Sequence, residues 1–178
     1  MQGRGLLQGL LEKELGDRIQ GRSADLDALA AYANSHRMPL SPHAKQGLSD
    51  AALRGKEIFF SEKTRCASCH NGAFYTDSTL HDSRLHDVGT GDDEDERIGP
   101  AYDTPTLLGI YRTPPYLHHG KAATLMDVLT TMNPDDRHGV TSHLSQAQRE
   151  DLVEYLKALP FEEPETAAER AGLTRIER

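Results

Sequence analysis

One short motif constrains this chain of 178 residues more than any other feature. Its only two cysteines, Cys66 and Cys69, are separated by two residues, and His70 follows directly. This C-x-x-C-H spacing is typical of c-type haem attachment, because both thiols can add to the vinyl groups of one porphyrin while the adjacent histidine binds the iron. We therefore predict one covalent haem c, attached through Cys66 and Cys69 with His70 as the proximal iron ligand.

A redox-active disulfide, half of a zinc site and chance are the other interpretations of this spacing. A redox motif does not require the histidine that follows Cys69. A structural zinc site needs four ligands, which demands a second Cys or His pair at ligand spacing. We therefore favour haem attachment over these interpretations.

The composition suits a chain that encloses a cofactor. Only 6% of the residues are aromatic and tryptophan is absent, so large side chains for a core are in short supply. A buried porphyrin would supply the missing apolar surface. The formal net charge of −8 argues against nucleic acid as a partner.

No transmembrane segment is expected. No stretch approaches the roughly 18 consecutive apolar residues that a spanning helix needs. Charged side chains interrupt the leucines near the start of the sequence, so no signal-peptide core is visible. We expect any targeting segment to have been removed.

Apolar residues recur at helical spacing in four segments. The segments are 23–36, a segment that starts at 49 and continues through Phe59 to the haem motif, 124–132 and 145–159. Ser49 and Ser145 are suited to cap the second and fourth segments, and Gln148 completes a capping-box pattern. Gly55 lies in the middle of the second segment, where the missing side chain would let the last helix approach closely beside Tyr155.

The segment from about 71 to 121 is rich in glycine and proline and has few strand signals. A long irregular segment of this kind can line a cofactor pocket. We predict an all-α fold, a class I cytochrome c-like helical domain wrapped around one covalent haem, with long irregular loops and an extra N-terminal helical segment.

Three regions follow from this pattern: a helical segment at 1–47, the haem domain at 48–160 and a charged tail at 161–178. The sequence at 27–32 is similar to that at 150–155. Chance similarity between two amphipathic helices explains this. The alternative is that the N-terminal helix closes a preceding cytochrome-like unit, in which case the chain is part of a larger protein.

Four stretches resemble the C-terminal haem domain of the bacterial di-haem cytochrome c peroxidase and MauG family. They are DTPTL at 103–107, RTPPYLHHG at 112–120, AATL at 122–125 and DLVEYLKAL at 151–159. The resemblance covers roughly residues 48–160. It implies attachment of the haem outside the cytoplasm, and we therefore expect a periplasmic or exported protein.

The resemblance places the family's axial methionine on Met132. Met132 is therefore the predicted sixth iron ligand, and thioether ligation would raise the reduction potential. The alternatives are a histidine or a position left open or filled by water. The candidate histidines are His118, His119, His138 and His143.

Two further residues are expected near the haem. Arg112 is predicted to contact a haem propionate, because a half-buried carboxylate needs a charge-assisted partner; a solvated surface arginine is the alternative. The residue that matches His118 in the family usually lies in the pocket without binding iron. We therefore expect His118 to hydrogen-bond the backbone or a propionate.

The favoured function is one-electron transfer to or from a redox protein or a neighbouring redox domain. The acidic net charge favours a partner with a basic patch. The alternative is an enzyme, namely the haem-bearing part of a di-haem peroxidase or MauG-like oxidase. The second haem would then lie on another domain or subunit, because this chain contains a single C-x-x-C-H. A gas-binding haem module is the third class, and whether the chain is an enzyme stays open.

Overall fold

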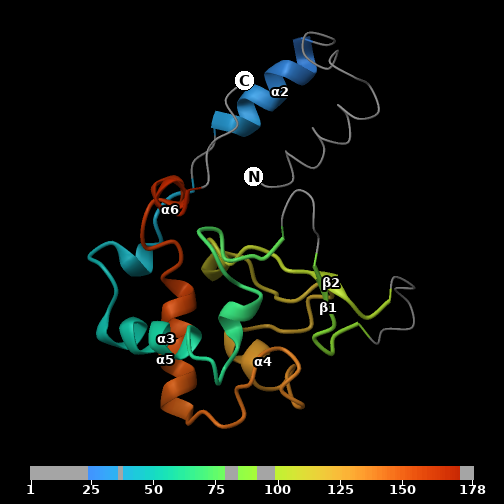
Figure 1. The fold of residues 1–178 in the computed structure, drawn as a ribbon, viewed down its shortest axis with the longest axis vertical. Coiled ribbons are helices and arrows are strands. Elements are labelled where there is room, and N and C mark those ends of the chain that lie inside the picture. Colours follow the sequence, from blue (N-terminus) through green and yellow to red (C-terminus); the bar gives the residue numbers. More distant parts are fainter. Residues whose placement is uncertain (1–23, 36–37, 79–83, 92–98, 173–178) are drawn as a thin grey trace. The chain divides into compact units, whose positions relative to one another are not determined.

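The computed structural model describes residues 24–35, 38–78, 84–91 and 99–172 (Figure 1). The chain divides into two compact units, of which one comprises Met1–Arg37 with Ser78–Ser83 and the other Met38–Asp77 with Arg84–Arg178. The α-helices are α2 (Ala24–Ser35), α3 (Asp50–Phe59), α4 (Leu125–Leu129), α5 (Gln146–Lys157) and α6 (Pro164–Arg170). The short 3-10 helices are η1 (Pro42–Ala44), η2 (Cys66–Ser68) and η3 (Ile110–Arg112).

In the first unit, α2 forms within the predicted segment 23–36. The remainder of the expected N-terminal helical segment, up to residue 23, lies outside the described residues. The other three predicted helices form in the second unit as α3, α4 and α5. The expectation that the helix of α3 continues to the haem motif is wrong, because it ends at Phe59 and Phe60 leaves helical geometry with φ −88° and ψ 3°.

The predicted caps of α3 and α5 are confirmed. The Ser49 hydroxyl accepts a hydrogen bond of 3.1 Å from the backbone N–H of Ala52. Ser145 and Gln148 form a reciprocal capping box, in which the Ser145 hydroxyl accepts from Gln148 N at 3.3 Å and the Gln148 amide oxygen accepts from Ser145 N at 2.9 Å. These bonds satisfy donors that every helix start leaves unpaired, so the starts of both helices are defined locally.

The two helices cross at Gly55, as the sequence predicted (Figure 1). A Cβ atom on residue 55 would lie 2.0 Å from the backbone oxygen of Asp151 and 2.8 Å from the Cβ atom of Tyr155. The backbones are therefore in direct contact, which only glycine permits. On the surface, the Arg54 guanidinium donates two hydrogen bonds to the Asp151 carboxylate, at 2.8 and 2.7 Å.

The core lies around this crossing. The rings of Phe59 and Tyr155 have centroids 5.4 Å apart, and Tyr75 adds a third ring 5.9 Å from Phe59. Buried leucines surround the rings, and burying each contributes roughly 1.5–3 kcal/mol. They are Leu107, Leu125, Leu129, Leu144, Leu152, Leu156 and Leu159.

The segments that flank the predicted haem domain pack within the second unit. The fully buried Ser41 donates its hydroxyl to Lys157 O at 2.6 Å and its backbone N–H to Pro160 O at 2.9 Å. Beyond α5, Pro164 and Ala168 of α6 are buried. The structure therefore groups residues 38–47 with α5, and the proposed divisions at 47 and 160 stay predictions.

The long segment between η2 and α4 is mostly irregular, as predicted, and contains two short strands. β1 (Leu85–His86) pairs antiparallel with β2 (Tyr102–Asp103), in a register that places Leu85 opposite Asp103. The expectation of a mostly helical chain is thus confirmed for the described residues, with this one small ladder in addition.

α4 is shorter than the sequence pattern predicted. Its start is confirmed, because Thr124 and Asp127 form a capping box. It ends at Leu129, however, since Thr130 leaves helical geometry with φ −129° and ψ −86°. The expectation that Met132 continues the helical stripe is therefore wrong, and Met132 lies in the turn that follows the helix.

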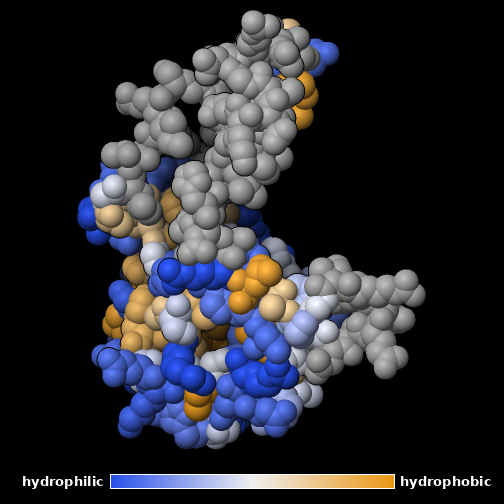
Figure 2. All heavy atoms as spheres, turned by 45° about the vertical axis from the view of Figure 1, so that its right-hand side comes forward, coloured by the Kyte–Doolittle hydropathy of each residue, from blue (hydrophilic) through white to orange (hydrophobic). Residues whose placement is uncertain are grey.

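No helix among the described residues combines the length and the apolar character needed to span a bilayer. Figure 2 shows a described surface that is mostly hydrophilic on this face, with apolar patches between the polar residues. The exposed large apolar side chains of the second unit are Leu40, Leu53, Phe60 and Leu85.

The substitution Gly55→Ala should lower the free energy of unfolding by about 1–3 kcal/mol or more, because overpacking forces the crossing helices apart. Urea denaturation of the haem-loaded protein measures this change. Glu57→Ala, at an exposed position of the same helix, is the matched control and should stay close to the unsubstituted protein. Equal stability of the two variants would show that the helices can separate at no cost.

Candidate functional site

The C-x-x-C-H motif follows α3 after a short connection, residues 60–65. The buried Thr64 ties this connection to the end of α3, since its hydroxyl donates to Ile58 O at 2.5 Å and to Ser61 O at 3.0 Å. The motif then forms η2, and the backbone N–H of His70 donates to Cys66 O at 3.1 Å. Local hydrogen bonds therefore hold both cysteines and His70 in one compact turn.

The His70 imidazole is oriented by the backbone. Its Nδ1 lies 3.2 Å from Tyr75 O, and a carbonyl oxygen can only accept, so Nδ1 carries the proton. Nε2 therefore keeps its lone pair. Burial lowers the pKa of His70, against the opposing effect of hydrogen bonds to the backbone of Tyr75 and Pro105. The ring is thus neutral, as a metal-binding imidazole must be.

Tyr75 is held in position by the helix crossing. It adopts a left-handed φ of 53°, which is unusual for a residue other than glycine and costs roughly 1–2 kcal/mol. Its hydroxyl lies 2.8 Å from the hydroxyl of the fully buried Tyr155 on α5. Burial raises the pKa of both phenols, so both stay protonated and hydrogen-bonded. α5 thereby supports the carbonyl that orients His70.

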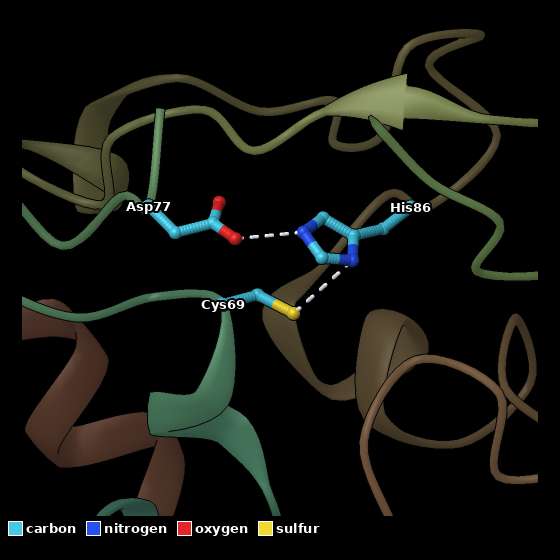
Figure 3. Close-up of side chains that lie close together, drawn as sticks. All are labelled: Cys69, Asp77 and His86. Carbon is cyan, nitrogen blue, oxygen red and sulfur yellow. Dashed lines mark hydrogen bonds and ion pairs between the residues drawn. The ribbon is translucent and has the colours of Figure 1, made fainter. Parts of the chain in front are cut away.

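The two thiols have different surroundings. Burial raises the pKa of the Cys66 thiol, which lies 3.9 Å from Thr64 O. The Sγ of Cys69 lies 3.6 Å from Nδ1 of His86 on β1. Figure 3 shows the His86 ring between Cys69 and Asp77.

His86 is bound on its other side by Asp77. Its Nε2 lies 2.7 Å from the Asp77 carboxylate, which is nearly inaccessible to solvent. Burial alone would raise the pKa of Asp77, but hydrogen bonds from Thr104 and His86 outweigh this and lower it. The lowered pKa keeps the Asp77 carboxylate ionised, so it accepts a hydrogen bond from Nε2 of His86 and leaves Nδ1 directed at the Cys69 thiol.

One ligand atom from each of these three side chains falls within 4.8 Å of the other two, which is the spacing of a metal site. The motif assigns Cys69 to haem attachment, so we interpret His86 and Asp77 as residues that support Cys69. The sequence analysis did not identify either residue. No local pattern marks them, because His86 is 17 residues from Cys69 and reaches it only through β1.

A second imidazole, that of His138, lies near His70. The ring centroids of His70 and His138 are 6.1 Å apart, and the rings are tilted by 40°. Nδ1 of His138 is buried without a hydrogen-bond partner among the described residues. Burial, and to a smaller extent the electrostatic interaction between the two imidazoles, lowers the pKa of His138 to about 4. His143, weighed beside it from the sequence, is exposed.

These residues fit a covalently attached haem. The donor set contains two thiols and a neutral imidazole with an unprotonated Nε2. Gly139 adds room beside the motif, because a Cβ atom there would lie 3.6 Å from the Sγ of Cys66 and 3.1 Å from Thr64 O. Cys66, Cys69 and His70 are therefore the residues that would hold the group.

The remaining predicted site residues lie in other surroundings. The exposed Arg112 donates from Nη2 to the sulfur of Met38 at 3.3 Å. The ring of His118 stacks on Tyr102 with centroids 3.9 Å apart. The backbone N–H of the half-buried Met132 donates to Asp127 O at 2.9 Å. The haem contacts expected for Arg112, His118 and Met132 stay predictions.

Comparison with known proteins identifies the class first. A family described as cytochrome c matches residues 52–160. This match spans more than half of the chain, which therefore belongs to the cytochrome c family. The fold is accordingly a cytochrome c fold, covalently bound haem c is the cofactor of the family, and the function is haem-based redox chemistry.

The relatives then define the group within the family. Hydrazine synthase subunit gamma from Kuenenia stuttgartiensis is 36% identical, over 75% of this chain and 48% of that protein. The methylamine utilization protein MauG from Methylophilus methylotrophus is 24% identical, over 84% of this chain and 50% of that protein. The chain belongs to the cytochrome c peroxidase and MauG-like group, as its motifs predicted, and spans about half the length of these relatives.

A solved structure agrees with this assignment. The hydrazine synthase of Kuenenia stuttgartiensis superposes with a TM-score of 0.63 and 34% sequence identity, covering 75% of this chain and 55% of that one. The similarity extends beyond the haem motif to the arrangement of the helices.

The substitution Tyr155→Phe should lower the free energy of unfolding by about 1 kcal/mol, because it leaves the Tyr75 hydroxyl without its partner. Tyr111→Phe is the matched control, and urea denaturation compares the two. In a double-mutant cycle, adding Tyr75→Phe to Tyr155→Phe should cost less than Tyr75→Phe alone. Strictly additive effects would contradict the coupling of these hydroxyls.

Proposed function

We propose that this chain is a one-electron-transfer domain of an exported, periplasmic protein, with a single haem c attached through Cys66 and Cys69 and bound axially by His70. The orientation of His70 carries this proposal. His70 directly follows Cys69, and its Nδ1 is held by Tyr75 O at 3.2 Å. Its Nε2 is therefore available to iron. A chance C-x-x-C-H would have no reason to fix the tautomer of its histidine in this way.

When bound, haem c supplies an iron that alternates between the ferric and ferrous states. The chain's own residues keep the site rigid through that change. Tyr155 holds Tyr75, whose carbonyl holds His70, while Thr64 anchors the motif to the end of α3. Little rearrangement between the two oxidation states is what an electron-transfer site requires.

Charge and attachment chemistry support the location and the kind of partner. The net charge of −8 favours docking to a redox protein or domain with a basic patch. Attachment of haem c to reduced cysteines outside the cytoplasm supports an exported chain. His86, whose Nδ1 lies 3.6 Å from the Cys69 Sγ, is placed to take the proton of that thiol during attachment.

Cysteine variants test the attachment. After expression with haem c maturation machinery, the unsubstituted chain should keep its haem on a denaturing gel, whereas Cys66→Ser/Cys69→Ser should lose all haem staining. Each single variant should retain one thioether, and its pyridine haemochrome band should move to longer wavelength because one vinyl group stays conjugated. Ser68→Ala, between the cysteines, is the control for altered folding. Haem staining of the double variant would contradict the proposal.

The second candidate is the haem-bearing half of a peroxidase or MauG-like oxidase. Two observations favour it. This chain matches about half the length of relatives named cytochrome-c peroxidase, and it contains one haem motif. In that case the reaction with peroxide takes place at a haem on another domain or subunit, and this chain supplies electrons to it.

Hydrogen peroxide separates the two candidates for the isolated chain. If both axial positions are occupied by side chains, the ferric spectrum should not change when peroxide is added, and no turnover of a reductant should follow. A rapid spectral change would favour a peroxide-reactive iron and would contradict the electron-transfer proposal. Stopped-flow absorption of the haem-loaded chain measures this.

A further inference from the structure

The imidazole near His70 belongs to His138, which lies outside the stretches that resemble the family. Their centroid separation of 6.1 Å differs clearly from that of stacked rings in the same protein, because Tyr102 and His118 stack with centroids 3.9 Å apart. Two imidazoles that share one metal ion through bonds of about 2 Å each have centroids about 6 Å apart. The observed separation therefore leaves room for one metal ion between the two rings.

The side chain of His138 is also unexplained by the protein's own interactions. Its Nδ1 is buried and has no hydrogen-bond partner among the described residues. A buried polar atom without a partner is destabilising. A ligand bound at Nδ1 would supply the partner that this atom lacks in the protein.

The backbone of His138 is held rigidly by one buried side chain. The amide oxygen of Asn133 accepts from His138 N at 2.8 Å, and its amide nitrogen donates to His138 O at 3.2 Å and to Gly139 O at 2.9 Å. The same nitrogen lies 3.2 Å from the Thr141 hydroxyl. Asn133 thus binds both peptide groups that flank the imidazole, which orients His138 before any ligand is present.

The same loop is tied to the cysteine motif. The backbone N–H of Val140 donates to Thr64 O at 2.9 Å, and Thr64 lies two residues before Cys66. Gly139, with a left-handed φ of 75°, allows this close approach, because a Cβ atom there would lie 3.1 Å from Thr64 O. The position of His138 relative to the motif is therefore set by backbone contacts rather than by a mobile loop.

We propose that His138 is the second axial ligand of the haem iron, in place of the Met132 that the family resemblance predicts. This inference rests on the proposed function, since it requires a haem c attached at Cys66 and Cys69. Two imidazole ligands give a lower reduction potential than one imidazole and one thioether, because methionine ligation raises the potential. The domain would then donate electrons at a lower potential than a domain with histidine and methionine ligands.

Near-infrared magnetic circular dichroism and electron paramagnetic resonance of the ferric, haem-loaded chain test the ligand directly. The unsubstituted chain should be low-spin and lack the charge-transfer band of a methionine–iron bond. Met132→Leu and the control His143→Ala should leave the spectrum unchanged. His138→Ala should become high-spin and return to low-spin when imidazole is added.

His138→Met covers the case in which His138→Ala does not fold. It should introduce the methionine band and raise the reduction potential relative to the unsubstituted chain. A methionine band in the unsubstituted chain that Met132→Leu abolishes would overturn the inference and leave the proposed function intact. A high-spin unsubstituted chain that His138→Ala does not alter would overturn it as well. A matured chain that holds no covalent haem would instead overturn the proposed function, and the inference with it.

Discussion

The direct contact between the backbones of α3 and α5 at Gly55 sets the geometry on which the rest of the structure depends. A side chain at this position would overlap the carbonyl of Asp151, so the helices can cross this closely only with glycine here. The crossing brings Tyr155 to Tyr75, whose carbonyl accepts from Nδ1 of His70. The orientation of the motif histidine therefore depends on a contact between two helices, made by a glycine that lies 15 residues before His70 in the chain.

The site is supported by two separate polar arrangements. His86 and Asp77 approach Cys69 through the β1 segment, whereas Asn133 holds the loop of His138. A buried polar network stabilises a structure only when its members are paired. The Asn133 side chain meets this condition, because its oxygen and its nitrogen both have partners. Among the described residues, Nδ1 of His138 and Oδ1 of Asp77 are buried without a hydrogen-bond partner.

Redox proteins of one fold can work at very different potentials, because the axial ligand and the polarity around the haem set the potential. In this chain the choice lies between a thioether in the turn after α4 and an imidazole presented by the next loop. The stretch from Asn133 to Thr141 fixes the position of His138. A single asparagine side chain hydrogen-bonds to the backbone on both sides of that residue. A change of a few residues here would alter the potential without altering the fold.

Much of the local structure was predictable from the sequence, because its causes act over a few residues. The caps at Ser49 and Ser145 satisfy nearby helix donors, Gly55 marks a close approach, and the spacing of the cysteines is itself the attachment signal. The helical class and the membership of the cytochrome c peroxidase and MauG-like group followed from the same short patterns.

The parts that only the tertiary structure decided depend on residues far apart in the chain. His86 reaches Cys69 because β1 pairs with β2, and His138 faces His70 because the loop after α4 hydrogen-bonds to Thr64. Extrapolating the helical stripe to Met132 failed because Thr130 leaves helical geometry. Periodicity describes positions within one element, whereas the path of an irregular segment is set by long-range hydrogen bonds and packing, which no local pattern contains.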